Sequence, residues 1–461
     1  MDARELQAAV DAARREHNVP GVSAAFYADG AVTLAASGLN NVTTGVETTP
    51  ETLMHIGSIT KVINATLLLQ LVDDGKVELD RAVIDYLPEF RVRDAAATRT
   101  ITVEMLVNHT SGIDGDLLPD AGHDRETIAN TIARFSELGQ VHAPGRGRSY
   151  CNPGTVIAGY LCQRITGRTW YDLIRERIFE PLGLNDAAVL PEDALLHRGS
   201  VGHFLYKTSG KLERTSHVFL PLGYAPAGST AMLSAADLLT FARAHLGDGL
   251  APNGARVLSA ESAVRMRRRS APQSGPEAFD SGLGWRLSGE FVCHGGGGPG
   301  IVSFLIAHPA SQTAAVVLTN AEHGFAAIVD LMRPFLSARL GLDAFPALPQ
   351  SSGESVDPAR YVGRYETINT VHEVEFSERQ LTWASYSTQK YYDSSPMTKP
   401  APTPLVAVGG DRFVADSRVS TMPSSDTSLI TFLEPDANGQ MSYLMESLWL
   451  FPRCNAERKA A

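Results

Sequence analysis

The order of hydrophobic and polar positions predicts an α+β domain over the first three quarters of the chain. Leu6, Val10 and Ala13 lie on one face of an amphipathic helix. Residues 21–38 alternate around a turn at Asp29-Gly30 and predict a β-hairpin. Helical spacing recurs over 54–75, 102–108, 153–166, 169–178, 234–247 and 324–340, and two strands are expected over 301–320. Strands near both ends with helices between them predict an antiparallel sheet built from both ends, with a helical insertion.

The pattern changes after residue 342. Residues 343–358 are rich in Pro, Ser and Gly and show no apolar period, so we expect a linker that few contacts cross. Short alternating strands follow, over 370–376, 380–386, 404–408, 412–415, 428–434 and 442–451. This spacing predicts a small all-β barrel or sandwich. The predicted organisation is a large α+β domain over 1–342, the linker over 343–358, and a β-domain over 359–461.

Composition and charge exclude several classes of function. The 461 residues are 44% hydrophobic and 20% charged, and the formal net charge is −11, which is ordinary globular composition. No basic run suits nucleic acid or an anionic membrane surface. No apolar stretch is long enough for a transmembrane helix, and the first residues lack a leader pattern, so we expect a cytoplasmic protein. The oligomeric state stays open.

The cysteine and histidine patterns argue against metals and cofactors. Cys151, Cys162, Cys293 and Cys454 lack CxxC spacing, which fits a reducing compartment. Cys151 and Cys293 are expected to be small buried packing residues rather than a disulfide bridge. The thirteen histidines show no metal-ligand spacing. The glycines over 295–300 do not join a strand to a helix, so they predict no dinucleotide loop. We expect no metal and no cofactor.

Three short motifs carry candidate chemistry. Ser58 and Lys61 stand three apart at a helix start, so the ammonium lies beside a hydroxyl that needs a charge partner to be nucleophilic. Tyr150 and Asn152 stand two apart in a loop before a helix. His294 precedes four glycines whose N–H groups are suited to binding an oxyanion. Taken singly, each motif has a simpler explanation. The Ser58–Lys61 spacing can occur by chance, Tyr150 can be a buried tyrosine bonded to backbone, and the glycines after His294 can form a flexible turn.

Together and in this order the motifs resemble the penicillin-binding protein and serine β-lactamase superfamily. SxxK is followed about ninety residues later by YxN, and HxG comes before a late strand. LVNHTSGIDGD (106–116), PAGSTAMLSAADLLTFA (226–242) and GLGW (282–285) strengthen the likeness to its class C-like branch. That branch includes family VIII esterases, D-amino-acid peptidases and penicillin-binding-protein-type thioesterases. The 356–461 region resembles the lipocalin-like domain of some members.

The resemblance implies a role for each motif. Ser58 would form the acyl-enzyme, and Lys61 and Tyr150 would share proton transfer, with the identity of the general base left open. Asn152 would hold the substrate amide and help to fix Lys61. The backbone N–H groups of Ser58 and Gly297 would form the oxyanion hole, and Gly295 and Gly296 would line the substrate site.

Two features depart from the commoner pattern. His294-Gly295-Gly296 stands where many relatives have KTG, and a mostly neutral histidine grips a carboxylate weakly. We therefore expect poor β-lactam hydrolysis and a role for His294 toward an acyl donor without a strong anionic anchor. Lys207-Thr208-Ser209-Gly210 looks like KTG but lies in a polar hairpin-like stretch and is interpreted as a turn. His55 and His109 are expected to be structural.

Arg453 follows the apolar segment LWLFP near the chain end. It either extends to solvent along that strand or binds an anion such as a peptide carboxylate, with the β-domain capping the site.

Three functions remain open from the sequence. The first is hydrolysis by a D-stereospecific peptidase or an esterase. The second is cyclisation, in which a standalone thioesterase closes nonribosomal peptides at a D-configured C-terminal residue. The third is a non-catalytic sensor that stays acylated. The expected partner is a peptide or small acyl substrate, including thioester-activated peptides on carrier proteins. We favour cyclisation, because a cytosolic member needs a cytosolic acyl donor and a lid that excludes water favours an internal amine.

Overall fold

The computed structural model describes residues 1–115, 119–124, 126–206, 210–271, 280–345, 347–388, 398–416 and 427–454. Its first part is built on an eight-stranded sheet in the order β3-β2-β1-β13-β12-β11-β10-β9. The predicted pairing of the two chain ends is confirmed, because β1 pairs antiparallel with β13. The strands are β1 Gly21–Ala28, β2 Ala31–Asn41, β3 Val46–Glu47, β9 Asp280–Ser281, β10 Arg286–Ser288, β11 Phe291–Gly298, β12 Ile301–His308 and β13 Thr313–Thr319.

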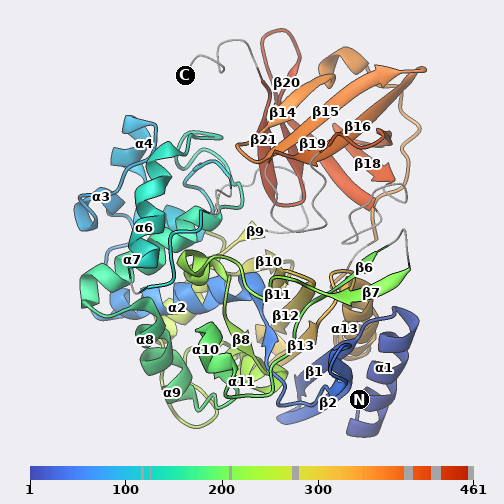
Figure 1. Ribbon diagram of the computed structural model, residues 1–461. Coiled ribbons are helices and arrows are strands. Elements are labelled where there is room, and N and C mark those ends of the chain that lie inside the picture. The colour runs from blue at the N-terminus through green and yellow to red at the C-terminus, as the bar shows by residue number, and fades with distance from the viewer. Residues whose placement is uncertain are drawn as a thin grey trace.

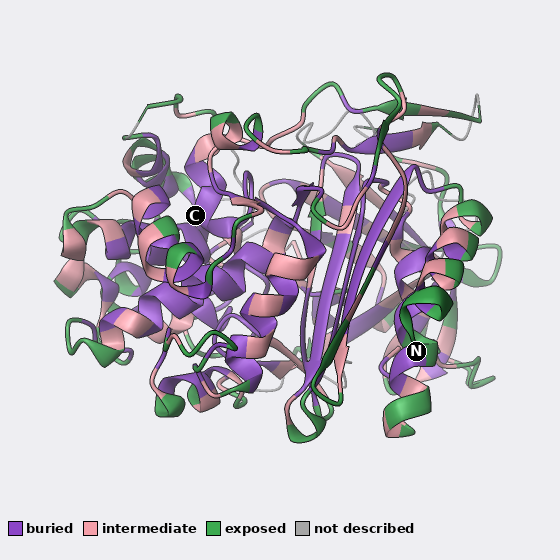
Figure 2. Cartoon of the chain, turned by 90° about the horizontal axis from the view of Figure 1, so that it is seen from below, coloured by how far each residue is buried: buried purple, intermediate pink, exposed green. Residues whose placement is uncertain are grey.

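Helices cover both faces of this sheet (Figures 1 and 2). On one face α1 (Ala3–Glu16) and α13 (Phe325–Leu340) enclose a core with alternate residues of the central strands, such as Ala24 and Val317. On the other face α11 (Ala235–Leu246) packs on the intervening residues, such as Ala25 and Val316. Because the sheet is buried on both sides, its central strands are almost continuously apolar.

The helical insertion is centred on α2 (Thr60–Asp73), which is buried on nearly every side and follows the short 3₁₀ helix η1 (Gly57–Ile59). Around it lie α3 Val83–Tyr86, α4 Ala95–Thr100, α5 Val103–Val107, α6 Thr127–Arg134, η2 Phe135–Glu137, α7 Asn152–Thr166, α8 Trp170–Ile174, the π-turn η3 Arg175–Phe179, α9 Glu180–Leu182, α10 Pro191–Ala194, η4 Leu222–Ala227 and α12 Ala260–Met266. A three-stranded sheet joins β4 Met54–His55, β8 Met232–Leu233 and β5 Ala187–Ala188.

A separate hairpin pairs β6 (His203–Tyr206) with β7 (Lys211–Arg214). The predicted turn at 207–210 has residues 207–209 outside the described part of the chain. In the described residues, no helix is both long and apolar enough to cross a membrane.

The C-terminal part is an antiparallel barrel of eight strands, β14 to β21 in sequence order. The bridge between Tyr365 and Arg453 brings the last strand back to the first and nearly closes the barrel. Its strands are β14 Gly363–Glu366, β15 Thr370–Ser377, β16 Gln380–Ser387, β17 Thr403–Gly409, β18 Arg412–Asp416, β19 Thr427–Pro435, β20 Met441–Glu446 and β21 Trp449–Pro452; the short turns η5 Pro309–Ser311 and η6 Pro358–Arg360 complete the elements.

One strand prediction is wrong. Residues 442–451 form two strands, β20 and β21, joined by the two-residue turn Ser447-Leu448. Ser447 has φ 57°, a left-handed conformation that an apolar or β-branched residue would rarely adopt. An apolar residue, Leu448, occupies the second turn position, so the pattern contained no polar interruption long enough to predict a turn. The strand β14 was also not predicted.

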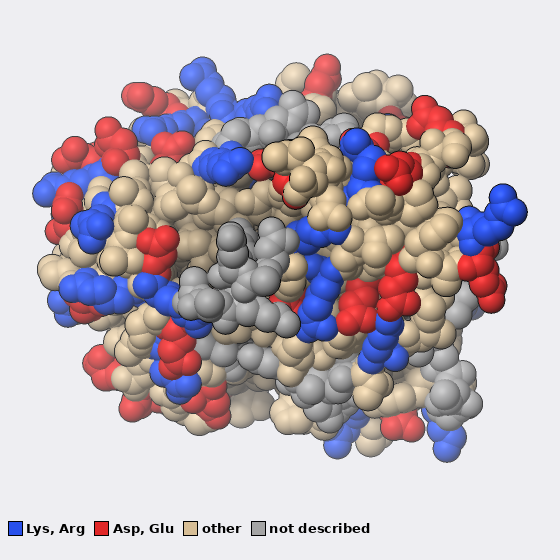
Figure 3. Space-filling model, turned by 90° about the horizontal axis from the view of Figure 1, so that it is seen from above, with Lys and Arg blue, Asp and Glu red and all other residues tan. Residues whose placement is uncertain are grey.

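A few specific hydrogen bonds join the two parts of the chain across the linker. Tyr150 N–H donates to the Leu448 carbonyl at 2.9 Å, and Leu450 N–H donates to Ser149 Oγ at 3.1 Å. Ile368 N–H donates to Asp114 Oδ1 at 3.2 Å. Figure 1 shows the barrel above the end of the sheet where β9, β10 and β11 lie. On the face seen from above, acidic and basic side chains are interspersed (Figure 3).

Candidate active site

Ser58 and Lys61 meet as their spacing predicts. Lys61 Nζ donates to Ser58 Oγ at 3.0 Å and to the Ala227 carbonyl at 2.6 Å. Ser58 lies in η1 and Lys61 in the first turn of α2, so both project from one side of the helix start. The lysine is 1% exposed. A buried amine with two fixed acceptors is held at the distance needed to exchange a proton with the serine.

The glycine strand β11 approaches the serine closely. A Cβ on Gly296 would lie 1.9 Å from the Ile56 carbonyl oxygen, and one on Gly57 would lie 2.7 Å from Gly297 N. Only residues without side chains allow this approach. The turn Pro299-Gly300 makes Gly298 and Ile301 a hydrogen-bonded pair, so by alternation the Gly297 N–H points away from β12, toward η1. The oxyanion-hole role of this N–H and of the Ser58 N–H stays a prediction.

Tyr150 lies between the two parts of the molecule. Its ring centroid is 4.9 Å from Lys61 Nζ, and the Tyr150 hydroxyl is buried with no hydrogen-bond partner among the described residues. Asn152 begins α7 and is half-buried. In the described residues no hydrogen bond joins Asn152 to Lys61, whose second partner is the Ala227 carbonyl. The roles of Tyr150 and Asn152 remain predictions.

The histidines of the site are held neutral by burial. His294 is 0% exposed, and its Nδ1 lies 2.7 Å from the Gly295 carbonyl, which places the proton on Nδ1. Burial, followed by the charges of Arg286 and Lys61, holds the pKa of His294 well below its ordinary value. Its Nε2 has no partner in the described part of the chain. A neutral imidazole cannot form an ion pair with a carboxylate, which agrees with the expected weak anchor.

The other two histidines position the motifs. His55 is buried, accepts from Gly57 N–H at 3.1 Å and contacts the Ser229 carbonyl at 2.9 Å, so it fixes the turn that carries Ser58. His109 has φ 66°, accepts from Cys151 N–H at 3.2 Å, and its ring lies 4.5 Å from that of Tyr150. The structural roles expected for both are confirmed.

Two residues of the site were not predicted. Arg286 on β10 lies with its guanidinium 5.5 Å from the Tyr150 ring centroid, and its Nε is buried without a partner among the described residues. Trp449 of the barrel packs edge-on against Tyr150 at 5.1 Å. Arg286 directly follows GLGW, so that segment could have indicated it. Trp449 could not be linked to the site from sequence, because only the docking of the barrel brings it there.

Arg453 is placed at the barrel seam. Its guanidinium donates to the carbonyls of Arg360, Met441 and Val362 and lies 5.6 Å from the Tyr365 ring centroid. These contacts connect the last strand of the barrel to the first, so Arg453 stabilises the closure of the barrel. The structure does not bring Arg453 together with Ser58, so the predicted carboxylate anchor gains no support from this placement.

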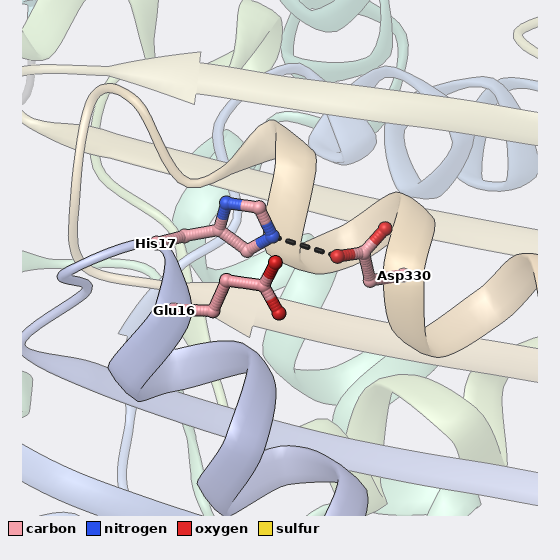
Figure 4. Close-up of side chains that lie close together, drawn as sticks. All are labelled: Glu16, His17 and Asp330. Atoms are coloured by element: carbon pink, nitrogen blue, oxygen red, sulfur yellow. Dashed lines mark hydrogen bonds and ion pairs between the residues drawn. The ribbon is translucent and has the colours of Figure 1, made fainter.

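Other clusters carry less chemistry. All four cysteines are free thiols, and Cys151 and Cys293 are buried as expected. Among the described residues, Glu16, His17 and Asp330 form a group whose ligand atoms could meet at a metal ion. Figure 4 shows the His17 ring directed at Asp330, at 2.7 Å, with Glu16 beside it. This partly exposed contact joins α1 to α13, and we interpret it as structural.

Comparison with known proteins identifies the family. The family model described as Beta-lactamase matches residues 6–365. Penicillin-binding protein 4 of Amycolatopsis lactamdurans is 37% identical over 375 residues, which are 79% of this chain and 98% of that protein. A crystal structure of SurE superposes with a TM-score of 0.79 at 25% identity and covers 98% of this chain and 99% of its own; a structure of SurE with D-Leu gives 0.75 at 24%.

The fold of the first part is also that of a class C β-lactamase. That structure gives a TM-score of 0.62 at 21% identity, over 74% of this chain and 99% of its own. The chain belongs to the β-lactamase and penicillin-binding protein superfamily of serine enzymes, with a lipocalin-like barrel following its catalytic domain.

Proposed function

We propose that this protein is a standalone penicillin-binding-protein-type thioesterase that cyclises nonribosomal peptides at a D-configured C-terminal residue. The observation that carries the proposal is the contact between Trp449 and Tyr150. It sets the barrel against the serine site, where it restricts access of water to the acyl-enzyme. Exclusion of water favours an amine as the acceptor.

The chemistry requires only groups of this chain and the substrate. The Ser58 oxygen attacks the thioester carbonyl, its proton passes to Lys61 or Tyr150, and the thiol leaves with a proton returned by the same pair. The neutral amine at the other end of the peptide then attacks the ester carbonyl. The C–N bond forms, the C–O bond to Ser58 breaks, and the amine proton goes to the serine oxygen. The N–H groups of Ser58 and Gly297 stabilise both oxyanions.

The stereochemical part of the proposal rests on likeness. SurE, whose structure with D-Leu is similar over both parts of this chain, motivates the choice of a D-configured acyl residue. The neutral His294 supports a donor without a free carboxylate, since a peptidyl thioester has none at its reacting end. A carrier-protein-bound peptide is the donor that fits these requirements.

Hydrolysis by a D-stereospecific peptidase or esterase is the alternative, because the same acyl-enzyme can be resolved by water. The test is a peptidyl thioester with a free N-terminal amine and a D-configured C-terminus, compared with its L-epimer. Cyclic product from the D-substrate supports the proposal. Linear acid as the sole product across varied sequences would leave the hydrolase. An acyl adduct that persists in the mass spectrum without product would indicate a sensor.

A further inference from the structure

A carboxylate lies on the barrel hairpin that contacts the serine site. Glu446 ends β20 and pairs with Trp449, the first residue of β21, across the turn Ser447-Leu448. Directly opposed residues of an antiparallel pair project from the same face. The carboxylate therefore stands beside the indole that packs on Tyr150.

This face of the hairpin is the inside of the barrel. Leu444 and Phe451, two residues away on the two strands, belong to the barrel core. Because side chains alternate along a strand, Glu446 and Trp449 face the same interior. They are the last inward positions before the turn whose Leu448 carbonyl accepts from Tyr150 N–H. Glu446 thus lies inside the end of the barrel that meets the serine site.

Glu446 has no cationic partner among the residues that the structure describes. Ser428 Oγ donates to its Oε1 at 3.0 Å, and its Oε2 accepts no hydrogen bond from the described protein groups. Burial raises the pKa of Glu446, and the Ser428 hydrogen bond opposes that shift. Glu446 is half-buried, and the more a carboxylate is removed from water without a cation, the more this costs. A ligand that brings its own cation would offset this cost.

A second side chain with one unused hydrogen-bonding atom faces the same interior. His372 on β15 is 1% exposed and pairs with Tyr365, a residue of the barrel core. Trp383 Nε1 donates to His372 Nδ1 at 2.9 Å, so the proton of the neutral ring is on Nε2. That N–H has no partner in the described part of the chain, and the ring lies 4.0 Å from Phe451. The interior therefore offers a donor as well as a carboxylate.

We propose that Glu446 binds the ammonium group of the acyl acceptor, the N-terminus of the peptide, while the His372 N–H holds a backbone carbonyl of the same segment. The bound ammonium passes one proton to Glu446, so the amine that attacks the ester carbonyl is neutral, and Glu446 releases that proton to solvent after the product leaves. The inference rests on the proposed function, because it names the group that accepts the acyl chain. The charges suit this orientation. Lys61 and Arg286 stand beside the serine, where negative charge develops on the acyl oxygen. Glu446 supplies the negative charge on the barrel side.

The test compares two peptidyl thioesters that differ only in a free or an N-acetylated amine. We expect the wild-type KM for thiol release to be about tenfold lower for the free amine, as charge-assisted hydrogen bonds predict. In Glu446→Gln this preference should vanish and the cyclic-to-linear ratio should fall. Thiol release at saturating substrate should stay within about twofold, because acylation does not involve the acceptor.

Glu375→Gln is the matched control. Glu375 is an exposed barrel glutamate that pairs with Lys399 on the outer surface, so its loss should leave both readouts unchanged. Equal KM values for the two thioesters in wild type overturn the inference, as does a preference retained in Glu446→Gln. A third outcome is linear acid as the only product, with the free-amine preference present in wild type and lost in Glu446→Gln. This result refutes cyclisation but supports the amine site. If Glu446→Gln fails to fold, Glu446→Asp and Ser428→Ala are measured instead. The proposal is overturned if both variants keep the wild-type preference for the thioester with the free amine.

Discussion

At the scale of single residues, three buried polar atoms lie together beside Ser58 and Lys61, where we expect the substrate to bind. Tyr150 Oη, His294 Nε2 and Arg286 Nε are all buried without partners among the described residues, around the Ser58–Lys61 hydrogen bond. Such groups are costly to leave unpaired. Their convergence on one place is the physical signal of a site. The spacing of Ser58 and Lys61 could be predicted from sequence because a helix start fixes their geometry locally.

Tyr150→Phe should lower thiol release from a peptidyl thioester on the order of a hundredfold, as expected for a positioned proton-transfer group. The ring contacts with His109 and Trp449 are kept, so the fold should be unaffected. The measurement is single-turnover thiol release with a melting curve of each protein. Ser58→Ala, which should abolish release, sets the background. A wild-type rate for Tyr150→Phe would remove the hydroxyl from the mechanism.

At the scale of elements, the β20–β21 hairpin and the glycine end of β11 form the two sides of the site. The close approach of β11 to η1 depends on glycine at Gly57 and Gly296, where any Cβ would collide with backbone. The hairpin depends on the turn Ser447-Leu448, whose carbonyl accepts from Tyr150 N–H. A backbone hydrogen bond to the residue beside the nucleophile fixes the barrel at a defined height above it.

Trp449→Ala should change how the acyl-enzyme is resolved and leave the rate of its formation nearly unchanged. Removing the indole opens Tyr150 to water, so the cyclic-to-linear ratio should fall about tenfold while hydrolysis of a small activated ester changes little. Product ratios by chromatography and ester turnover by absorbance give the two readouts. Phe376→Ala is the control, because Phe376 is an exposed aromatic, 50% accessible, in the same barrel. An equal loss in both assays would mean that the indole supports the fold of the site.

At the scale of the whole molecule, the chain has separate cores joined by specific contacts. Every buried member of the two catalytic-domain cores precedes residue 345, and the main barrel core begins at Tyr361. We therefore expect the parts to fold independently, although they meet at Ser149 and Tyr150.

Removal of residues 356–461 should leave a folded catalytic domain that still turns over small esters, because its cores remain complete. It should lose cyclic product from long peptidyl thioesters, because the barrel side of the site is gone. Calorimetry and both activity assays check this. A shortened protein that is unfolded, or that loses both activities equally, would show that the docking contacts are required for folding.

Stability should fall as the pH is lowered from 7 to 5. Burial lowers the pKa of His55, His109 and His294, and lowers it to about 3 in His245 and His372. In the unfolded chain these histidines take up protons near pH 6.5, so the unfolded state binds more protons below that value. Each fully shifted histidine costs about 2 kcal/mol at pH 5. Asp237, whose pKa is raised to about 6, acts in the opposite direction.

Urea unfolding at pH 7 and pH 5 measures this dependence. In His245→Gln the loss of unfolding free energy between the two pH values should be smaller by up to about 2 kcal/mol. His245 has no role in the proposed serine chemistry, because its Nε2 contacts the Thr66 hydroxyl of α2. An unchanged difference would mean that His245 is protonated in the folded protein.

The sequence by itself determined the elements whose signals are local. These are the β1–β2 and β12–β13 hairpins, helices such as α1, α2, α7, α11 and α13, the Ser58–Lys61 pair, and the glycines before β12. Hydrophobic period, turn residues and short spacing act within a few residues, so these signals are local. Only the tertiary structure decided what lies across the serine. The β20–β21 turn, the contact of Trp449 with Tyr150 and the seam position of Arg453 depend on how the barrel closes and docks. The contacts between the barrel and the serine site join residues about three hundred positions apart, and no periodicity within either segment records the partner surface.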